Sequence, residues 1–174
     1  MKDFKNYGFA TRQIHAGASP DANGSLCAPI YQTSTFAFSS VEQGGRRFAG
    51  EEEGYIYTRL GNPTQALVEG KMASLENGEA ALVTASGMGA ITTALWSSLK
   101  AGDHLLADET LYGCTFALLE HGLSEFGVEV DFEDFTDLEN VKKAIKPNTK
   151  VVYFETPCNP NLKVLDIAAI ASIA

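Results

Sequence analysis

Short apolar runs alternate with helical patterns of apolar residues through the second half of the chain. Strand-like runs occur at residues 80–85, 104–107, 128–132 and 150–154. Around these runs, apolar residues recur every three or four positions, which predicts helices at 62–77, 88–99, 116–126, 138–145 and 167–174. Strands that alternate with helices in this way predict βαβ units with right-handed crossovers, and therefore an α/β fold with a mainly parallel sheet covered by helices on both faces.

Local signals mark several of the helix ends. Asn62 is a good N-cap and Pro63 suits the first helical position, while Gly102 stops the helix that begins near Met88. Asp166 is a plausible cap for the last helix, yet the chain stops inside the apolar stretch that follows, with no glycine cap and no closing basic residue. This pattern predicts a truncated chain.

The first forty residues show no good helical pattern. Pro20, Gly24 and Pro29 interrupt them before an extended-looking run at residues 30–36. We expect an N-terminal arm, which either wraps around a partner subunit or forms a disordered tail. A polar loop with aromatic residues and arginines connects this arm to the first helix of the alternating region.

Composition narrows the classes of partner and compartment. The 174 residues include 13 basic and 22 acidic side chains, and the net charge of −9 argues against nucleic acid or an anionic membrane as the main partner. Nothing approaches the ~20 apolar residues of a membrane span, and the polar start, Met1–Asp3 onward, is unlike a signal peptide. We expect a cytoplasmic protein with reduced thiols and no metal, since the three cysteines and three histidines lie far apart in the sequence.

A Ser-Gly-x-Gly turn joins the first predicted strand to the helix after it. Small residues at Ser86, Gly87 and Gly89 let backbone N–H groups approach a ligand, and the start of a helix carries unpaired N–H groups and partial positive charge. The junction therefore suits a phosphate. Packing of strand against helix is an equally acceptable explanation of the glycines.

Two further loops follow predicted strands and should lie beside that turn. Ligands of open α/β sheets collect beyond the carboxyl ends of the strands. The loops at 108–114 and 155–161 would add a tyrosine, carboxylates and an amide, which together suit a flat phosphorylated ring. Neither G-x-G-x-x-G after the first strand nor a P-loop sequence occurs, which disfavours dinucleotides and P-loop chemistry.

Five runs of residues carry a resemblance to a known family. They are Pro29–Phe36, Tyr57–Thr64, Ser86–Ala90, Leu111–Thr115 and Glu155–Pro160. In this order they resemble the Cys/Met-metabolism family of pyridoxal-phosphate (PLP) enzymes, the trans-sulfuration enzymes. The resemblance implies an incomplete PLP-transferase type I fold, with an aspartate aminotransferase-like large domain. It divides the chain into an N-terminal arm with an inter-subunit loop at 1–61 and the N-terminal part of the PLP-binding domain at 62–174.

The resemblance also assigns residues to the cofactor. It implies that Gly87 and Met88 bind the PLP phosphate through their N–H groups and that Ser86 shapes the turn. It implies that Tyr112 stacks on the pyridine ring and that its phenol protonates the departing thiolate. A buried tyrosine bonded to a carbonyl is the alternative for Tyr112.

Other implied cofactor contacts come from the last loop and from a second subunit. Glu155 and Asn159 would line the polar edge of the ring, although an Asn-Pro turn alone also explains Asn159. Tyr57 and Arg59 would hold the phosphate of the neighbouring subunit, although a solvated loop arginine is the default without the motif. The resemblance therefore implies a dimer as the functional unit and a homotetramer as the full assembly.

Within the family, the sequence most resembles the lyases that act on methionine. Cys114 favours them, unless it is only a small buried residue. The implied reaction of the full-length protein is γ-elimination of L-methionine to methanethiol, 2-oxobutanoate and ammonia. Alternatives are a cystathionine γ-synthase, an O-acetylhomoserine sulfhydrylase, or a non-catalytic binding or assembly module.

One departure from the family pattern is serious. None of the nine lysines stands in the Ser-x-Thr-Lys setting of the Schiff-base lysine, and we expect them in the arm, on helix surfaces or at strand edges. The aspartate that faces the pyridinium nitrogen is missing as well. We therefore expect this chain alone to be inactive.

Overall fold

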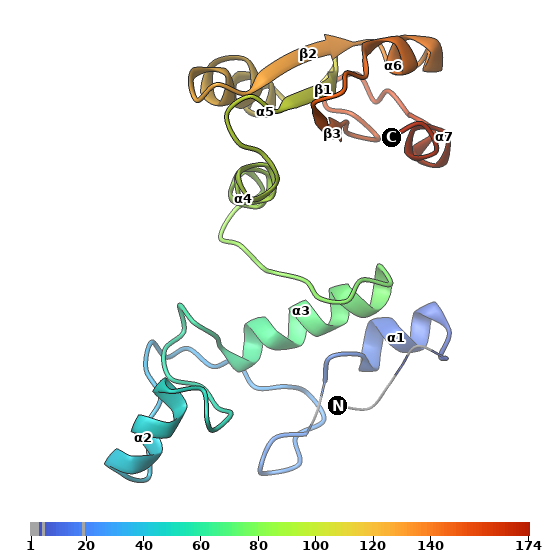
Figure 1. Ribbon diagram of the computed structural model, residues 1–174. Helices are drawn as coiled ribbons and strands as arrows, with labels where there is room; N and C mark the ends of the chain where they lie inside the picture. The colour runs from blue at the N-terminus through green and yellow to red at the C-terminus, as the bar shows by residue number, and fades with distance from the viewer. Residues whose placement is uncertain (1–3, 5, 19) are drawn as a thin grey trace. The chain divides into compact units, whose positions relative to one another are not determined.

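The computed structural model describes residue 4, residues 6–18 and residues 20–174 (Figure 1). Lys2 and Lys5, and the polar start Met1–Asp3, lie outside the described residues. The chain divides into two compact units, Met1–Val83 and Thr84–Ala174. Each is described by itself below.

The described residues of unit 1 form three helices: α1 Phe9–His15, α2 Val41–Phe48 and α3 Pro63–Leu75. The prediction of α3 is confirmed, because the Asn62 side chain accepts a hydrogen bond from Thr64 N and Pro63 occupies the first turn. The expectation of no helix in the arm is wrong for α1, and α2 was not expected. The cap of α1, Gly8, makes no side-chain hydrogen bond, so this helix lacks the local signal that marks α3.

The arm packs within its own unit. Arg12 on α1 donates from Nε to Ser74 Oγ at 3.1 Å and from Nη2 to Asn77 Oδ1 at 3.0 Å, which fixes α1 against the end of α3. Farther along, Thr35 and Tyr57 form an antiparallel bridge that joins the extended run to the polar loop. The described part of the arm is therefore not a free tail.

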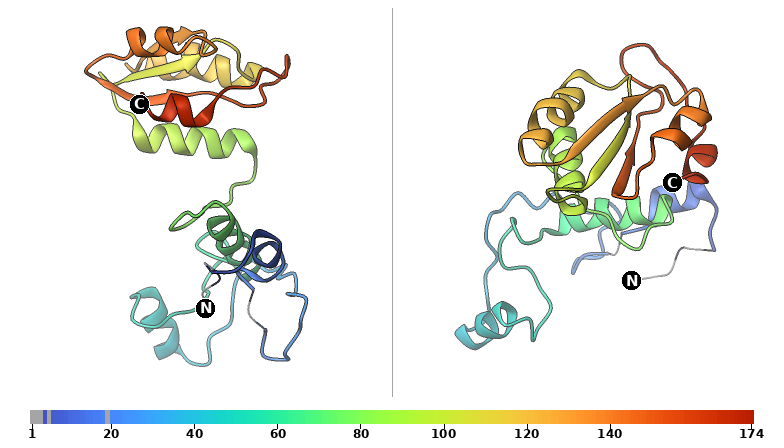
Figure 2. Two further views of the ribbon diagram at one scale, coloured as in Figure 1. Left: turned by 90° about the vertical axis from the view of Figure 1, so that its right-hand side faces the viewer. Right: turned by 45° about the horizontal axis from the view of Figure 1, so that its top comes forward.

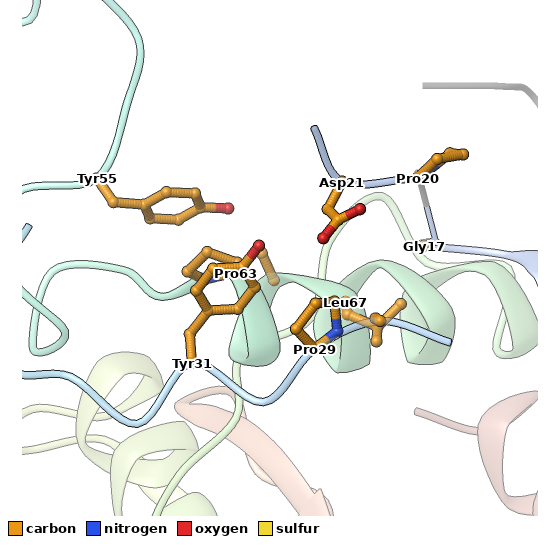
Figure 3. Close-up of a pocket in the computed structure, with 10 residues that line it drawn as sticks. Gly17, Pro20, Asp21, Pro29, Tyr31, Tyr55, Pro63 and Leu67 are labelled. Atoms are coloured by element: carbon orange, nitrogen blue, oxygen red, sulfur yellow. The ribbon is translucent and has the colours of Figure 1, made fainter. Parts of the chain in front are cut away.

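A cavity of about 260 Å³ lies in unit 1 between the arm and the start of α3 (Figure 3). Tyr31 and Tyr55 line it together with Asp21, above an apolar floor that includes Pro63 and Leu67. The Asp21 carboxylate accepts hydrogen bonds from its own turn, at 2.9 Å from Ser25 N and 3.0 Å from Asn23 N. These bonds lower the pKa of Asp21, and the bond from Ser25 has the largest effect.

Unit 2 is built on a three-stranded parallel sheet in the order β2-β1-β3. The strands are β1 His104–Asp108, β2 Glu129–Glu133 and β3 Thr149–Tyr153, in agreement with three of the four predicted strands. The central strand β1 is buried along its whole length. Leu106 lies opposite Asp131 on β2 and opposite Val152 on β3, and the pairing with β3 shifts register between His104 and Leu105.

The predicted strand at 80–85 is wrong. These residues have no strand conformation, and Leu82 is 72% exposed. A strand exists only where a neighbouring strand pairs with its backbone. None of the described strands pairs with this run; instead Val83 N donates to the Glu69 carboxylate at 3.0 Å.

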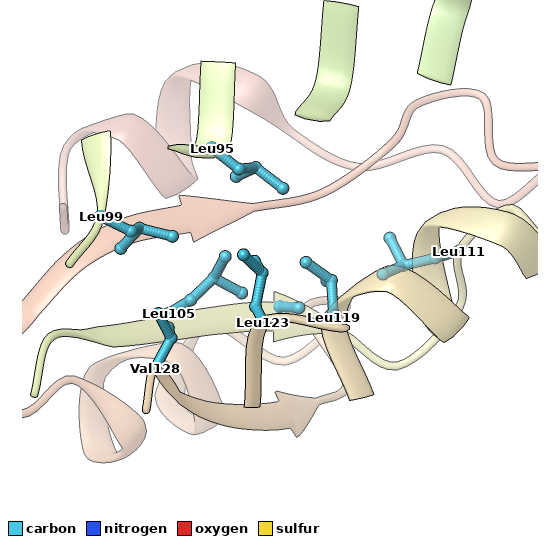
Figure 4. Packing of buried hydrophobic residues seen from close by; sticks show 8 residues of the cluster. Leu95, Leu99, Leu105, Leu111, Leu119, Leu123 and Val128 are labelled. Carbon is cyan, nitrogen blue, oxygen red and sulfur yellow. The ribbon is translucent and has the colours of Figure 1, made fainter. Parts of the chain in front are cut away.

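Helices cover both faces of the sheet, as predicted (Figure 2). They are α4 Gly87–Ser98, α5 Gly113–Ala117, the π-helix η1 Leu118–Leu123, α6 Leu138–Ala144 and α7 Ile167–Ala171. Leu95 of α4 and Leu119 of η1 pack with Leu105 on one face (Figure 4). Val141 of α6 and Ile170 of α7 pack with Leu106 on the other. The alternation of side chains along β1 thus builds two cores.

Two general features of the described residues bear on partners. No helix among them is long and apolar enough to cross a membrane. No group of three or more His, Cys, Asp or Glu side chains among them is arranged to hold a metal ion.

Candidate functional site

The turn before α4 leaves two backbone N–H groups available. Ser86 is the N-cap, and its Oγ accepts from Gly89 N at 3.0 Å. Among the described residues, no acceptor bonds the N–H groups of Gly87 and Met88, which begin the helix. A Cβ on Gly87 would meet nothing within 4 Å, so the space in front of it is open. Unpaired N–H groups at the start of a 12-residue helix suit a phosphate.

Tyr112 precedes α5 and is 42% exposed. The Cys114 Sγ lies 3.4 Å from its Oη, within hydrogen-bond distance, and the hydrogen bond and then the charge interaction with Cys114 raise the pKa of the Tyr112 phenol. Cys114 itself is exposed. Both side chains of this pair are therefore accessible in this chain, whereas the two alternatives expected buried side chains.

Glu155 follows β3 and uses both carboxylate oxygens. Oε2 accepts from Tyr112 N at 3.0 Å, and Oε1 accepts from the Tyr153 hydroxyl at 3.3 Å. Burial, and after it the charge of Glu155, raises the pKa of Tyr153 to about 12, so the phenol stays protonated and can donate. Glu155 thus connects the loop after β3 to the loop that carries Tyr112.

Asn159 is exposed in a tight turn after β3. The turn is closed by hydrogen bonds from Leu162 N to Cys158 O at 2.8 Å and from Cys158 N to Lys163 O at 2.9 Å. This geometry agrees with a turn residue and leaves the amide side chain accessible to a ligand.

The three loops that were expected to converge do so. Thr115, fully buried, donates to Met88 Sδ at 3.9 Å and so connects α5 to the start of α4. Cys158, also buried, donates its thiol proton to Thr110 O at 2.9 Å. With the Tyr112–Glu155 bond, these contacts bring three segments to one region of unit 2. They are the turn at residues 86–88, here called the cradle, the loop at 108–114, here called the tyrosine loop, and the loop at 155–161.

Tyr57 and Arg59 lie together in unit 1. The Arg59 guanidinium is 4.8 Å from the centroid of the Tyr57 ring, a cation–π contact. Both line an apolar cavity of about 370 Å³ with Phe36, Phe38 and Leu60 among its walls. Among the described carboxylates, none forms an ion pair with Arg59, so its charge is available to an anion.

The lysines were expected in the arm, on helix surfaces or at strand edges, and for Lys163 this expectation is wrong. Lys163 is only 13% exposed, and its Nζ lies 3.0 Å from Asp108 Oδ1 and 3.0 Å from Asp134 Oδ1. Burial lowers its pKa, but the bonds to the two carboxylates outweigh burial, so the pKa of Lys163 is raised. An amine held protonated in this way is not a nucleophile.

Several residues around the site were not singled out from the sequence: Asp108, Thr115, Tyr153 and Lys163. The partners of Asp108, Thr115 and Lys163 that hold the site together are 27 to 55 residues away along the chain, so no local pattern marks these three. Tyr153 bonds Glu155 only two residues on, but no motif marks that pair. The only useful signal was the position of Asp108 at the carboxyl end of a buried strand.

The described residues fit a flat phosphorylated ring such as PLP. Two unpaired N–H groups begin α4, a Cβ on Gly87 would meet nothing within 4 Å, and a half-exposed tyrosine ring stands on the next loop. The covalent anchor of PLP, an unprotonated lysine, is not among the residues that surround this region in the described part of the chain.

Comparison with known proteins agrees with this fit. The model of the family described as Cys/Met metabolism PLP-dependent enzyme matches residues 10–174. L-methionine gamma-lyase of Treponema denticola is 64% identical over 99% of this chain and 43% of that protein. O-acetyl-L-homoserine sulfhydrylase of Corynebacterium glutamicum is 44% identical over 97% of this chain and 39% of that protein.

A solved structure matches the fold. It is an O-acetylhomoserine (thiol)-lyase of Campylobacter jejuni that contains N′-pyridoxyl-lysine-5′-monophosphate, with a TM-score of 0.86 and 36% identity over 97% of this chain and 42% of that one. The chain spans less than half the length of each of these relatives.

Proposed function

This chain belongs to the Cys/Met metabolism family of PLP-dependent enzymes, and on that premise we propose that it forms the phosphate-binding part of a carbon–sulfur lyase acting on L-methionine. The observation that carries the proposal is the difference in identity: 64% to an L-methionine gamma-lyase, against 46% to a probable cystathionine gamma-synthase and 44% to a sulfhydrylase. The exposed Cys114 beside Tyr112 supports it.

Each residue of the site has a task in this proposal. The Gly87 and Met88 N–H groups would bind the cofactor phosphate, and Ser86 holds the turn in shape. The Tyr112 ring would stack on the cofactor, and Asn159 and Glu155 would hold its polar edge. When bound, PLP supplies the electron sink for proton removal from the amino acid. Methionine and water then give methanethiol, 2-oxobutanoate and ammonia.

Tyr112 supplies the proton for the leaving sulfur. A thiolate leaves more easily when a positioned acid protonates it. A phenol carries its proton at neutral pH, and Cys114 raises the pKa of the Tyr112 phenol further, so the proton is present for the transfer.

An enzyme assay tests the proposed substrate. These 174 residues would replace the matching part of the Treponema denticola enzyme, with the natural enzyme as control. We expect methanethiol from methionine alone. Conversion of O-acetylhomoserine and sulfide without any methanethiol from methionine would instead favour the sulfhydrylase alternative. A folded, cofactor-free chimera would favour a non-catalytic module.

We further propose that two subunits complete each site, within a cytoplasmic homotetramer. Tyr57 and Arg59 would reach the cofactor phosphate of a neighbouring subunit, for which the unpaired, stacked guanidinium is well suited. The three free cysteines support a reducing compartment.

Mixing two inactive variants of the chimera tests the shared site. Arg59→Ala should lose cofactor, and Tyr112→Phe should keep cofactor absorbance but eliminate methanethiol slowly. Mixed subunits should recover about a quarter of the normal activity, because half of the dimers are mixed and each holds one intact site. No recovery after verified subunit exchange would mean that Arg59 acts within its own subunit or is only a loop residue.

A further inference from the structure

Glu155 reaches the tyrosine loop through the main chain. Its Oε2 accepts the Tyr112 N–H at 3.0 Å across 43 residues of sequence. Tyr112 is the N-cap of α5, and its own side chain makes no capping bond. A distant carboxylate therefore does what a capping side chain does elsewhere: it satisfies a donor at the beginning of the helix and sets the direction in which the chain enters it.

A second contact fixes the same helix on its buried side. Thr115, fully buried, donates to Met88 Sδ at 3.9 Å. Met88 is the second residue of α4, beside the proposed phosphate cradle. The short α5 is thus bound at its start by Glu155 and one turn later by Met88. These two contacts determine where the Tyr112 ring lies relative to the cradle.

Tyr153 fixes the carboxylate in turn. It is the last residue of β3, and its hydroxyl donates to Glu155 Oε1 at 3.3 Å. The strand is paired with β1 in the sheet, whereas Glu155 belongs to the loop after it. The bond therefore ties the Glu155 carboxylate to the end of β3. Its other oxygen, Oε2, is then in position to accept from Tyr112 N.

We propose that Glu155 and Tyr153 are positioning residues that orient the Tyr112 ring over the cofactor through the Tyr112 main chain. The part of this inference that concerns the cofactor rests on the proposed function. Glu155 needs no contact with substrate in this role, because both its oxygens act on other side-chain and main-chain groups of the site.

Amide hydrogen exchange on the 174-residue chain tests the positioning without any cofactor. In Glu155→Ala, the Tyr112 amide should exchange about tenfold faster or more, since a hydrogen bond to a charged acceptor is lost. Glu155→Gln keeps an acceptor and should restore most of the protection. Leu105 and Leu106 amides on β1 serve as an internal reference, and Glu109→Ala, which changes an exposed glutamate directly after this strand, is the matched control.

Each outcome decides the positioning role. Faster exchange confined to the tyrosine loop supports it, whereas unchanged Tyr112 exchange in Glu155→Ala overturns it. If Glu155→Ala exchanges faster everywhere, it has lost its fold, and Tyr153→Phe then decides: a local increase at Tyr112 supports the role, and none overturns it.

Pyridoxine 5′-phosphate separates this inference from the proposed function. The probe has no aldehyde and cannot react with lysines, so its fluorescence reports only non-covalent binding to the chain. The natural chain should bind it, Glu155→Gln nearly as well, and Glu155→Ala about tenfold more weakly. Equal binding by Glu155→Ala and the natural chain would overturn positioning toward the cofactor. No binding by the natural chain would instead count against the proposed function, while the exchange result on Tyr112 would still stand.

Discussion

Asp108 and Lys163 illustrate how a single residue pair can join three parts of unit 2. Asp108 is fully buried at the end of β1, and its Oδ1 accepts from Phe135 N at 3.0 Å as well as from Lys163. Lys163 also contacts Asp134. A buried charge without its partner is costly, so the pair holds the loop after β3 to the central strand.

Replacing Lys163 by Met should therefore lower the free energy of unfolding by about 3 kcal/mol, because the Asp108 carboxylate stays buried without its counter-charge. Adding Asp108→Asn should recover much of this loss. Urea unfolding at pH 7, followed by circular dichroism, measures both. The control is Lys142→Met, whose ion pair with Glu139 is more than half exposed and contributes less than about 1 kcal/mol. Equal losses in the two lysine variants would contradict the importance of burial.

Asp134 makes stability depend on pH in the acid range. Hydrogen bonds from Thr136, and then the bond from Lys163, lower its pKa from 3.8 to about 2 in the folded chain. The unfolded chain therefore binds this proton at a higher pH than the folded chain does. The stabilisation is complete above the unfolded pKa and is lost as the pH falls through the folded value.

Acid unfolding of Asp134→Asn measures this contribution. The stability difference between the natural chain and the variant should be largest above pH 4 and should shrink toward pH 2, since protonated Asp134 resembles asparagine. Urea midpoints at half-unit pH intervals give the curve. A difference that stays constant from pH 5 to pH 2 would show that the carboxylate charge does not matter.

At the scale of elements, the sequence predicted those that carry their own signals. The helix α3 has Asn62 and Pro63 at its start, and β1 is an apolar run. The helix α2 could have been found, because Ser40 accepts from Gln43 N in a capping-box spacing. The 80–85 run could not be settled locally, since strand formation depends on a partner elsewhere in the chain.

α4 ends at Ser98, where Leu99 turns extended, so the expectation that Gly102 stops this helix is wrong, and Gly102 instead shapes the turn that follows. Gly102 has φ +88° and ends the turn between α4 and β1, where its N donates to Gly127 O at 2.8 Å. Gly102→Ala should destabilise unit 2 by about 1 kcal/mol because alanine disfavours this backbone conformation. Gly113→Ala is the matched control: Gly113 lies in α5, and a Cβ there meets nothing within 4 Å. Thermal unfolding compares the two, and an equal effect would remove the conformational explanation.

At the scale of the molecule, the start of α4 at Ser86 and Gly87 was predictable, and the contacts around it were not. The sequence pattern marks this turn as the beginning of a helix, although the strand expected before it is absent. The Tyr112–Glu155 and Thr115–Met88 contacts join residues 43 and 27 positions apart. Such pairings follow from the packing of the whole unit, which no short stretch of sequence encodes.

The division into two units predicts where a protease cuts first. Residues 79–85 form neither helix nor strand, and Leu82 is 72% exposed, so their backbone is open to attack. All three strands, and the helices α4 to α7 that cover them, lie after Thr84. Thermolysin, which cleaves before large apolar residues, should first cut near Leu82 and release a fragment that begins at residue 82 or 83 and keeps its sheet.

Mass spectrometry of a cleavage time course identifies the first cut, and circular dichroism of the purified fragment reports whether the sheet survives. Leu82→Asp provides the control, since it removes the preferred site without touching a buried residue and should slow the first cut. A first cut inside β1 or η1 would mean that the two cores around β1 do not hold unit 2 together as an independent body. Loss of the sheet after a cut near Leu82 would mean that unit 2 needs the first 83 residues to stay folded.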